Sequence, residues 1–353
     1  MEQFSDIYRL KYICRILRIC LQPKAIYIVG SRAGNVYRPD SDYDLLIYLG
    51  IIRTIFMFPK LKALEKKINH RLGIELSIGP LTPFRLYWSK SNLFLFKVKQ
   101  YSKLLYGTDV RDEMRANLQD ISTENYISYL ICCLMKIMVD VDIRGIFSKK
   151  HLTKQSSISV LKGFLACAEV ELFLNNKIYK NSEDLLVQYL KVFKHQRQTE
   201  LFKVLETLDP TNFNYEFDVS FWFLCKNSII RLLSRLIASE FNYKNHELTR
   251  IFELYSQKIS LPIFGNYRYV ISKFLMGGGL DIIRLIQFKR VDRFYRMVLC
   301  LLACTIRPEG FNDKLLDILF NKRIVIGSKG NLERCESILI ETQKHLKWTE
   351  TVL

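Results

Sequence analysis

Two short apolar runs, residues 24–29 and 44–49, frame a polar loop and limit the folds open to the start of this chain. Each run has the length and the aliphatic content of a buried strand, and the glycine, asparagine, proline and serine residues between them are typical of a loop. Apolar side chains recur with helical spacing over 5–21, while basic ones fill the other face. This region therefore predicts a helix, a strand, an exposed loop and a second strand.

The next elements extend the mixed pattern to about residue 115. The lysine-rich stretch 59–72 predicts a helix, and residues 74–78 alternate apolar and polar side chains as a half-buried strand does. That alternation places Glu75 on the polar face of its strand. Residues 103–107 predict a last short strand. We expect residues 1–115 to form one small mixed-sheet α+β domain.

From about residue 122 the pattern is helical almost throughout. Glycine and proline breaks at 210, 262–265 and 277–279 divide it into a helical bundle over 116–210 and a second helical region over 211–353, for which acceptor or RNA binding is an expected role. The expected fold class is α+β, with the small domain followed by all-helical regions. The expected helices lie near 122–144, 152–176, 182–195, 217–240, 246–258 and 280–304.

Composition and charge narrow the class of protein. Apolar residues make up 49% of the chain and charged residues 25%, as in ordinary globular proteins. The longest apolar runs are about half of what a membrane-spanning helix needs, and basic residues interrupt the N-terminal segment, so we expect a cytoplasmic protein without a membrane partner. The nine cysteines lack zinc-site spacing and predict reduced core thiols. A net charge of +18 favours a polyanionic partner.

The loop between the first two strands carries the residues with the clearest chemistry. Gly30 and Ser31 follow the first strand, where a glycine lets backbone N–H groups approach phosphate oxygens and a serine adds a hydroxyl donor. Asp42 and Asp44 open the second strand two residues apart, so their carboxylates face the same way and can hold magnesium. Arg32 also lies in this loop.

Arg32 and Arg38 have two equally weighted interpretations. As basic residues of the phosphate-side loop they could contact a triphosphate or an acceptor backbone, or they could be solvated. Further along the chain, Lys289, Arg293 and Arg296 recur with helical spacing. A solvated helix face is favoured there over a track for RNA phosphates.

The sequence V-G-S-R-A-G-N-V-Y-R-P-D-S-D-Y-D-L-L-I over 29–47 resembles the DNA polymerase β-like nucleotidyltransferase superfamily, and most closely its kanamycin-type and minimal branch. The motif L-Y-G at 105–107 extends the likeness over about 22–110. The resemblance implies that Gly30 and Ser31 bind a nucleoside triphosphate such as ATP, and that Asp42 and Asp44 hold two Mg²⁺ ions. It implies transfer of a nucleoside monophosphate to an acceptor hydroxyl with release of pyrophosphate.

The same resemblance implies a third carboxylate on a later strand, and Glu75 is the candidate for this catalytic and metal-binding role. Many members carry aspartate there, and the alternative is an exposed strand residue. In kanamycin-type enzymes a glutamate of the helical bundle can act as general base, which makes Glu169 and Glu171 candidates, although an ordinary helix surface is favoured for both.

The acceptor stays open among an RNA or tRNA end, a small hydroxylated molecule and a protein side chain. The alternative from another functional class is a non-catalytic nucleotide- or RNA-binding module of a toxin–antitoxin or defence system. The presence of Gly30, Ser31, Asp42 and Asp44 together favours the enzyme.

Overall fold

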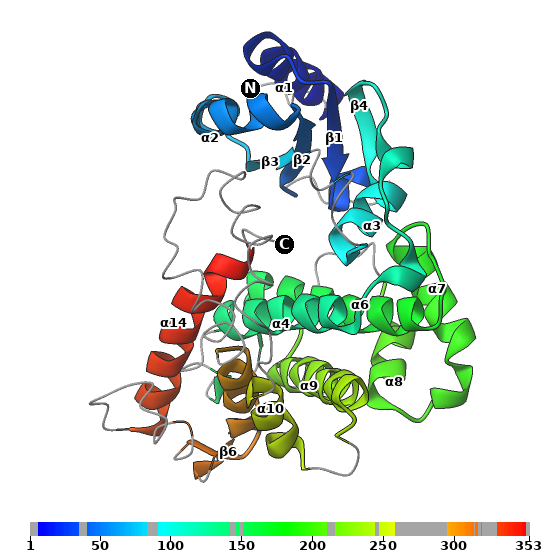
Figure 1. The fold of residues 1–353 in the computed structure, drawn as a ribbon. Coiled ribbons are helices and arrows are strands. Elements are labelled where there is room, and N and C mark those ends of the chain that lie inside the picture. The colour runs from blue at the N-terminus through cyan, green and yellow to red at the C-terminus, as the bar shows by residue number, and fades with distance from the viewer. Residues whose placement is uncertain are drawn as a thin grey trace. The chain divides into compact units, whose positions relative to one another are not determined.

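In the computed structural model the chain forms two compact units, and the boundary between them follows Ser122 (Figure 1). The residues whose structure is described are 6–34, 41–82, 86, 91–141, 146–147, 151–209, 216–243, 247–257, 295–313, 315–316, 319 and 330–350.

The first unit is built on a four-stranded mixed sheet with the strand order β3-β2-β1-β4. Strand β1 pairs antiparallel with both β2 and β4, whereas β2 and β3 are parallel. The predicted α+β fold class is confirmed, and the four predicted strands are found with boundaries that differ by at most three residues. The elements in chain order are α1 (Asp6–Leu21), β1 (Ala25–Val29), β2 (Tyr43–Tyr48), α2 (Ile51–Leu72), β3 (Leu76–Leu81), α3 (Leu93–Tyr101) and β4 (Lys103–Gly107).

The core of this unit lies between one face of the sheet and helices α1 and α2. Strand alternation sends Tyr43, Leu45 and Ile47 of β2 into that core. Asp42 and Asp44 therefore belong to the opposite face. Leu17 of α1 is among the helix residues that are fully buried against the sheet. Two layers of secondary structure thus separate the outer surfaces of α1 and α2 from the carboxylates.

Helix α2 begins at Ile51, eight residues before the start that the sequence predicted. A proline is favoured in the first turn of a helix, which made Pro59 look like the start. The structure instead places the boundary at Gly50, whose backbone φ of 80° only glycine adopts readily. The apolar and β-branched stretch before Pro59 is consequently part of the helix.

The second unit is almost entirely helical and is organised around α6. This helix is buried around nearly its whole circumference and packs against α4, α7 and α9. Side-chain caps fix several helix starts, as where Thr153 Oγ1 accepts from the Ser156 N–H. The elements are α4 (Thr123–Val139), α6 (Lys154–Leu174), α7 (Ser182–Val192), α8 (Glu200–Thr207), α9 (Val219–Phe241), α10 (Leu248–Gln257), helical residues 295–305, β5 (Ile306–Arg307), β6 (Gly310–Phe311) and α14 (Asn331–Glu350).

Most helices of this unit are where the sequence predicted them. The predicted helix over 280–304 is described from residue 295 onward, and its earlier part lies outside the described residues. Helices α8 and α14 and the β5–β6 hairpin were not predicted. None of the nine cysteines forms a disulfide. No helix in the described part of the chain has the length and hydropathy needed to cross a bilayer.

Candidate active site

Gly30 directly follows β1 and lies beside a carboxylate of the neighbouring strand. Val29 pairs with Asp44 across the β1–β2 ladder, so the next residue of the chain passes the Asp44 side chain. A Cβ atom added to Gly30 would lie 2.7 Å from Asp44 Oδ2, and the backbone φ of 71° disfavours any other residue. The structure therefore brings the predicted phosphate loop and the predicted metal ligand together.

Asp42 and Glu75 meet at the point where β2 and β3 begin. The Tyr43 N–H donates to the Glu75 carbonyl oxygen over 2.7 Å, which places the residues before the two strands side by side. Hydrogen bonding to Asp42 and the negative charge of that carboxylate raise the pKa of Glu75. Glu75 thus lies next to the D-x-D motif, on the face opposite Tyr43.

These carboxylates suit magnesium as oxygen donors. Two like-charged carboxyl groups in contact repel each other when both are ionised, and a bound cation relieves this repulsion. Among the described residues, no group of three or more His, Cys, Asp or Glu side chains is arranged to hold a metal ion. Mg²⁺ commonly uses only one or two carboxylates and completes its shell with substrate phosphates and water. Asp42 and Asp44 fit that pattern, and the three-carboxylate set remains a prediction.

Arg32 is buried in the protein, with only 3% of its side chain exposed. Its Nη1 donates to Asp6 Oδ2 over 2.6 Å, and its Nε donates to the Ser41 carbonyl oxygen over 2.7 Å. The guanidinium stacks 3.8 Å from the centre of the Tyr43 ring, and the Tyr43 hydroxyl donates to Asp6 Oδ1 over 2.6 Å. Arg32 therefore ties helix α1 to the residue just before Asp42.

This geometry differs from the two roles weighed for Arg32 from the sequence. A solvated side chain is ruled out by its burial, and its guanidinium is occupied by protein partners beside the core-facing Tyr43. The sequence offered one signal for the network, because Asp6 is the only acidic residue of the N-terminal helix. Ser31 is exposed and begins a short 3₁₀ turn over Ser31–Ala33. Arg38 lies outside the described residues.

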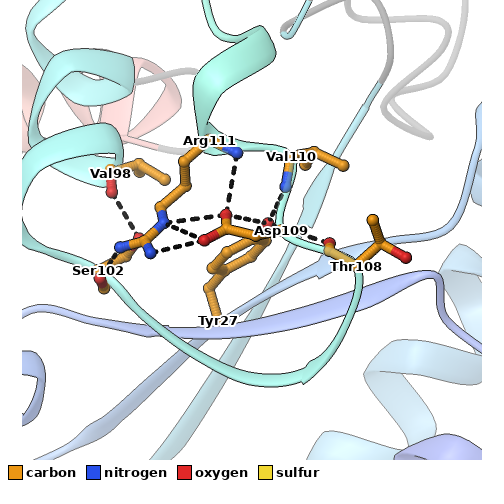
Figure 2. Close-up of polar contacts among 7 residues, drawn as sticks. All are labelled: Tyr27, Val98, Ser102, Thr108, Asp109, Val110 and Arg111. Atoms are coloured by element: carbon orange, nitrogen blue, oxygen red, sulfur yellow. Dashed lines mark hydrogen bonds and ion pairs between the residues drawn. The ribbon is translucent and has the colours of Figure 1, made fainter.

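A second polar network fixes the chain after β4 to the sheet (Figure 2). The buried Tyr27 hydroxyl accepts from the Val110 N–H over 2.7 Å and donates to Asp109 Oδ1 over 3.2 Å. Arg111 Nη2 donates to Asp109 Oδ2 over 2.6 Å, and its Nη1 donates to the Ser102 carbonyl oxygen over 2.6 Å. The hydrogen bond from Arg111 lowers the pKa of Asp109 to about 2.

Tyr27 belongs to the face of the sheet that carries the carboxylates. It precedes Val29 by two residues on β1, and Val29 pairs with Asp44. The network thus holds the β4 loop against that face of the sheet. No pattern in the sequence marks the members of this network, because Asp109 and Arg111 are two residues apart in a loop and meet Tyr27 only in the folded chain.

Glu169 and Glu171 are buried, so the favoured interpretation of an ordinary helix surface is wrong. Glu171 accepts from the Tyr189 hydroxyl over 2.7 Å and from Arg235 over 2.6 Å, and Glu169 accepts from the Tyr179 hydroxyl. The periodicity of α6 gave no polar face to mark them, because the helix is buried on nearly all sides. Both carboxylates connect elements within the helical unit.

Arg296 is also buried, and the interpretation of a solvated basic stripe is wrong at this position. It donates to the Ser128 hydroxyl over 2.7 Å and pairs with Glu124 over 3.3 Å. The other members of that predicted stripe, Lys289 and Arg293, lie outside the described residues.

The comparisons with known proteins bear on the first unit. Residues 13–99 match the family model of the nucleotidyltransferase domain. No curated protein and no solved structure matches the chain. The matched range includes Gly30, Ser31, Asp42, Asp44 and Glu75, and it does not specify a branch of the superfamily. With the glycine, the paired aspartates and the mixed sheet in place, residues 13–99 are a nucleotidyltransferase domain of the polymerase β-like superfamily.

Proposed function

We propose that the protein transfers a nucleoside monophosphate from a nucleoside triphosphate to an acceptor hydroxyl and releases pyrophosphate, with magnesium as cofactor. The contact between Gly30 and Asp44, beside the Asp42–Glu75 pair, carries this proposal. It supports a site in which a phosphate-binding turn and hard oxygen ligands face one reacting phosphorus atom.

Each residue has a defined task in the proposed reaction. Backbone N–H groups after Gly30 and the exposed Ser31 hydroxyl bind the outgoing phosphates. Asp42 and Asp44 hold the magnesium, which when bound neutralises charge on the attacking and leaving oxygens. Glu75, beside Asp42, takes the proton of the acceptor hydroxyl as its oxygen bonds to the α-phosphorus. The bond between the α-phosphorus and the bridging oxygen breaks, and pyrophosphate leaves.

Two radioactive labels distinguish this reaction from transfer of the γ-phosphate. Each of the four triphosphates, labelled at the α-phosphorus, is incubated with the protein, Mg²⁺ and either total RNA or a cell extract. Label should move to the acceptor fraction, whereas a γ-label should appear in pyrophosphate. Transfer of the γ-label to an acceptor would instead indicate a kinase. The fraction that carries α-label identifies the acceptor as RNA, small molecule or protein.

Site variants tie the activity to these carboxylates. Asp42→Asn and Asp44→Asn should each abolish transfer while circular dichroism stays unchanged, because the amide cannot replace a charged metal ligand. Asp112→Asn removes an exposed carboxylate of the same unit and serves as the matched control. Transfer that persists in both site variants refutes the proposed site.

A non-catalytic nucleotide- or RNA-binding module is the second candidate. It predicts triphosphate binding without any transfer of the α-label. Equilibrium dialysis with labelled triphosphate, run beside the transfer assay, separates the two functions.

A further inference from the structure

The outer surface of α1 and the adjoining edge of α2 carry seven exposed basic side chains. On α1, Lys11, Arg15 and Arg18 share one helix face. On α2, the spacing of seven, seven and four residues also aligns the basic side chains on one face. The α2 members are Arg53, Lys60, Lys67 and Arg71. These seven residues are called the α1–α2 basic surface.

Helices α1 and α2 run antiparallel, and two contacts place their basic faces next to each other. Near the start of α2, Arg53 Nη1 donates to the carbonyl oxygen of Gln22, which follows α1, over 3.1 Å. Near the end of α2, the Arg71 guanidinium lies 5.5 Å from the centre of the Tyr12 ring. The basic edge of α2 therefore faces α1 at both ends, which places the two basic stripes on neighbouring helices.

Acidic side chains do not neutralise this surface in the described part of the chain. Helix α1 contains one acidic residue, Asp6, which pairs with the buried Arg32. Helix α2 contains one, Glu65, which lies on the opposite flank and accepts from the Ile78 N–H over 2.8 Å. None of the seven basic residues has an ion pair with a described carboxylate. The surface is thus complementary to a polyanion.

Aromatic rings lie among the charges. Arg18 is stacked 4.3 Å from the centre of the Tyr106 ring, and Lys11 lies 6.0 Å from the exposed ring of Tyr8. Basic side chains that track phosphates and aromatic rings on which bases stack are the combination found in proteins that bind single-stranded nucleic acid.

The exposed apolar residues do not form a membrane-binding face. The apolar face of α1 is buried in the core through Ile13, Leu17 and Leu21, whereas an interfacial helix inserts that face into lipid. The exposed isoleucines, Ile7 at 63% and Ile19 at 70%, stand twelve residues apart, about 18 Å along the helix. They are isolated rather than a patch.

We propose that the α1–α2 basic surface binds single-stranded nucleic acid through its phosphate backbone, with Tyr8 stacking on a base. The surface lies on the helical side of the sheet, whereas Asp42 and Asp44 belong to the other face. It is a docking surface that holds the strand away from the reacting phosphorus, and it does not depend on the proposed transfer reaction.

Fluorescence anisotropy with a labelled single-stranded 20-mer tests the proposal on the full-length protein. RNA and DNA strands should both bind, and log Kd should rise with log salt concentration by about 0.7 for each phosphate contacted. The triple variant Lys11→Gln, Arg15→Gln, Lys67→Gln should bind roughly tenfold more weakly at 0.1 M salt and lower this slope by about 2. Tyr8→Ala should weaken binding about fivefold or more.

The matched control removes three exposed lysines from the helical unit. Lys177→Gln, Lys180→Gln, Lys191→Gln has the same net charge as the test variant and should bind as the unaltered protein does. Asp44→Asn should also keep its affinity for the strand, so a failure of transfer and a failure of this surface are told apart.

Three results would overturn the proposal. The first is that the triple variant and the control variant bind the oligonucleotide with equally reduced affinity. The second is the absence of binding to both strands. The third is binding of anionic phospholipid vesicles or of polyglutamate as tightly as the oligonucleotide, with the same loss in the triple variant, which would assign the surface to a membrane or an acidic protein.

Discussion

Gly30 and Gly50 share a backbone conformation that only glycine adopts readily, but their surroundings differ. Gly30 has φ 71° and ψ −154°, and Gly50 has φ 80° and ψ 166°. A Cβ at Gly30 would lie 2.7 Å from Asp44 Oδ2, whereas a Cβ at Gly50 would meet nothing within 4 Å. Substitutions at the two positions therefore distinguish the effect of backbone strain from the effect of displacing Asp44, the proposed metal ligand.

We expect Gly30→Ala to abolish transfer and Gly50→Ala to retain most of it. Both substitutions should lower the free energy of unfolding by about 1–3 kcal/mol through the strained backbone. Only the first also pushes the Asp44 carboxylate out of place. Urea unfolding and the α-label transfer assay measure the two effects. Equal activity of the two variants would show that the close approach of Gly30 to Asp44 does not matter for the reaction.

Arg32 illustrates how a residue beside a motif can serve the fold of the site. Its position after Gly30-Ser31 made phosphate contact a reasonable prediction, because loop arginines beside a phosphate turn often bind anions. The pairing with Asp6, 26 residues earlier, and the stacking on Tyr43 depend on the packing of α1 against the sheet. No local pattern in the sequence contains that information.

We expect Arg32→Met to lower the free energy of unfolding by about 3–5 kcal/mol, because it leaves the Asp6 carboxylate without its buried partner. Arg115→Met, at an exposed arginine of the same unit, should change it by less than about 0.5 kcal/mol. Urea unfolding followed by circular dichroism measures both. An unchanged stability with a raised KM for the triphosphate would instead restore Arg32 as a phosphate ligand.

Among the elements, the strands and the longer helices were the most predictable. Strand alternation was enough to place Asp42 and Asp44 on one face and Tyr43 on the other, and to place Glu75 on the polar face of its strand. The position of Glu75 beside Asp42 was implied by the family resemblance and depends on the pairing of β2 with β3. The features that the sequence did not predict are a helix boundary and a network of contacts between elements. The helix boundary at Gly50 was missed because Pro59 gave a competing signal, and the anchor of β4 was missed because its members meet only in three dimensions.

The polar network of Tyr27, Asp109 and Arg111, which holds the chain after β4, leads to a prediction about the pH dependence of stability. Arg111 and Tyr27 hold the pKa of Asp109 at about 2, below its ordinary 3.8. A depressed carboxyl pKa stabilises the folded state above the ordinary pKa, so this contribution is present above about pH 4 and is lost as the pH falls toward 2. Asp109→Asn should therefore flatten the dependence of unfolding free energy on pH in that window.

The control for this pH range is Asp112→Asn, which removes an exposed carboxyl from the same loop. It should leave the pH profile of unfolding close to that of the unaltered protein. A profile that Asp109→Asn and Asp112→Asn change to the same extent would contradict a specific role of the Asp109–Arg111 pair in holding β4.

Across the whole molecule, polar residues in helical segments were the hardest to interpret from sequence. Glu169, Glu171 and Arg296 are of residue types that usually lie on the exposed face of a helix. All three are nevertheless buried and have partners elsewhere in the fold. Burial of a charged group is tolerated only when hydrogen bonds and opposite charges compensate for lost water. Their partners lie 10 to 172 positions away in the sequence, and sequence spacing cannot reveal such pairs.

Glu171 connects three helices of the second unit and gives a prediction at this scale. It accepts from Tyr189 of α7 and from Arg235 of α9, while it is itself part of α6. Glu171→Gln should cost about 2 kcal/mol of unfolding free energy, less than a fully buried pair because 57% of the Arg235 side chain is exposed and stays hydrated. Tyr189→Phe should cost about 1–2 kcal/mol.

The double variant then tests whether the carboxylate joins the helices. Tyr189→Phe removes the hydrogen bond to residue 171, and Glu171→Gln replaces its charged acceptor with a neutral one. Because both substitutions act on the same interaction, the double variant should cost less than the sum of the two by about 1 kcal/mol. Tyr189→Phe combined with Glu183→Gln, an exposed glutamate of α7, should be additive within about 0.5 kcal/mol. Urea unfolding of all six proteins, including the unaltered chain, completes both cycles. Additivity in the Glu171 cycle would mean that α6 and α7 are held by their apolar contacts alone.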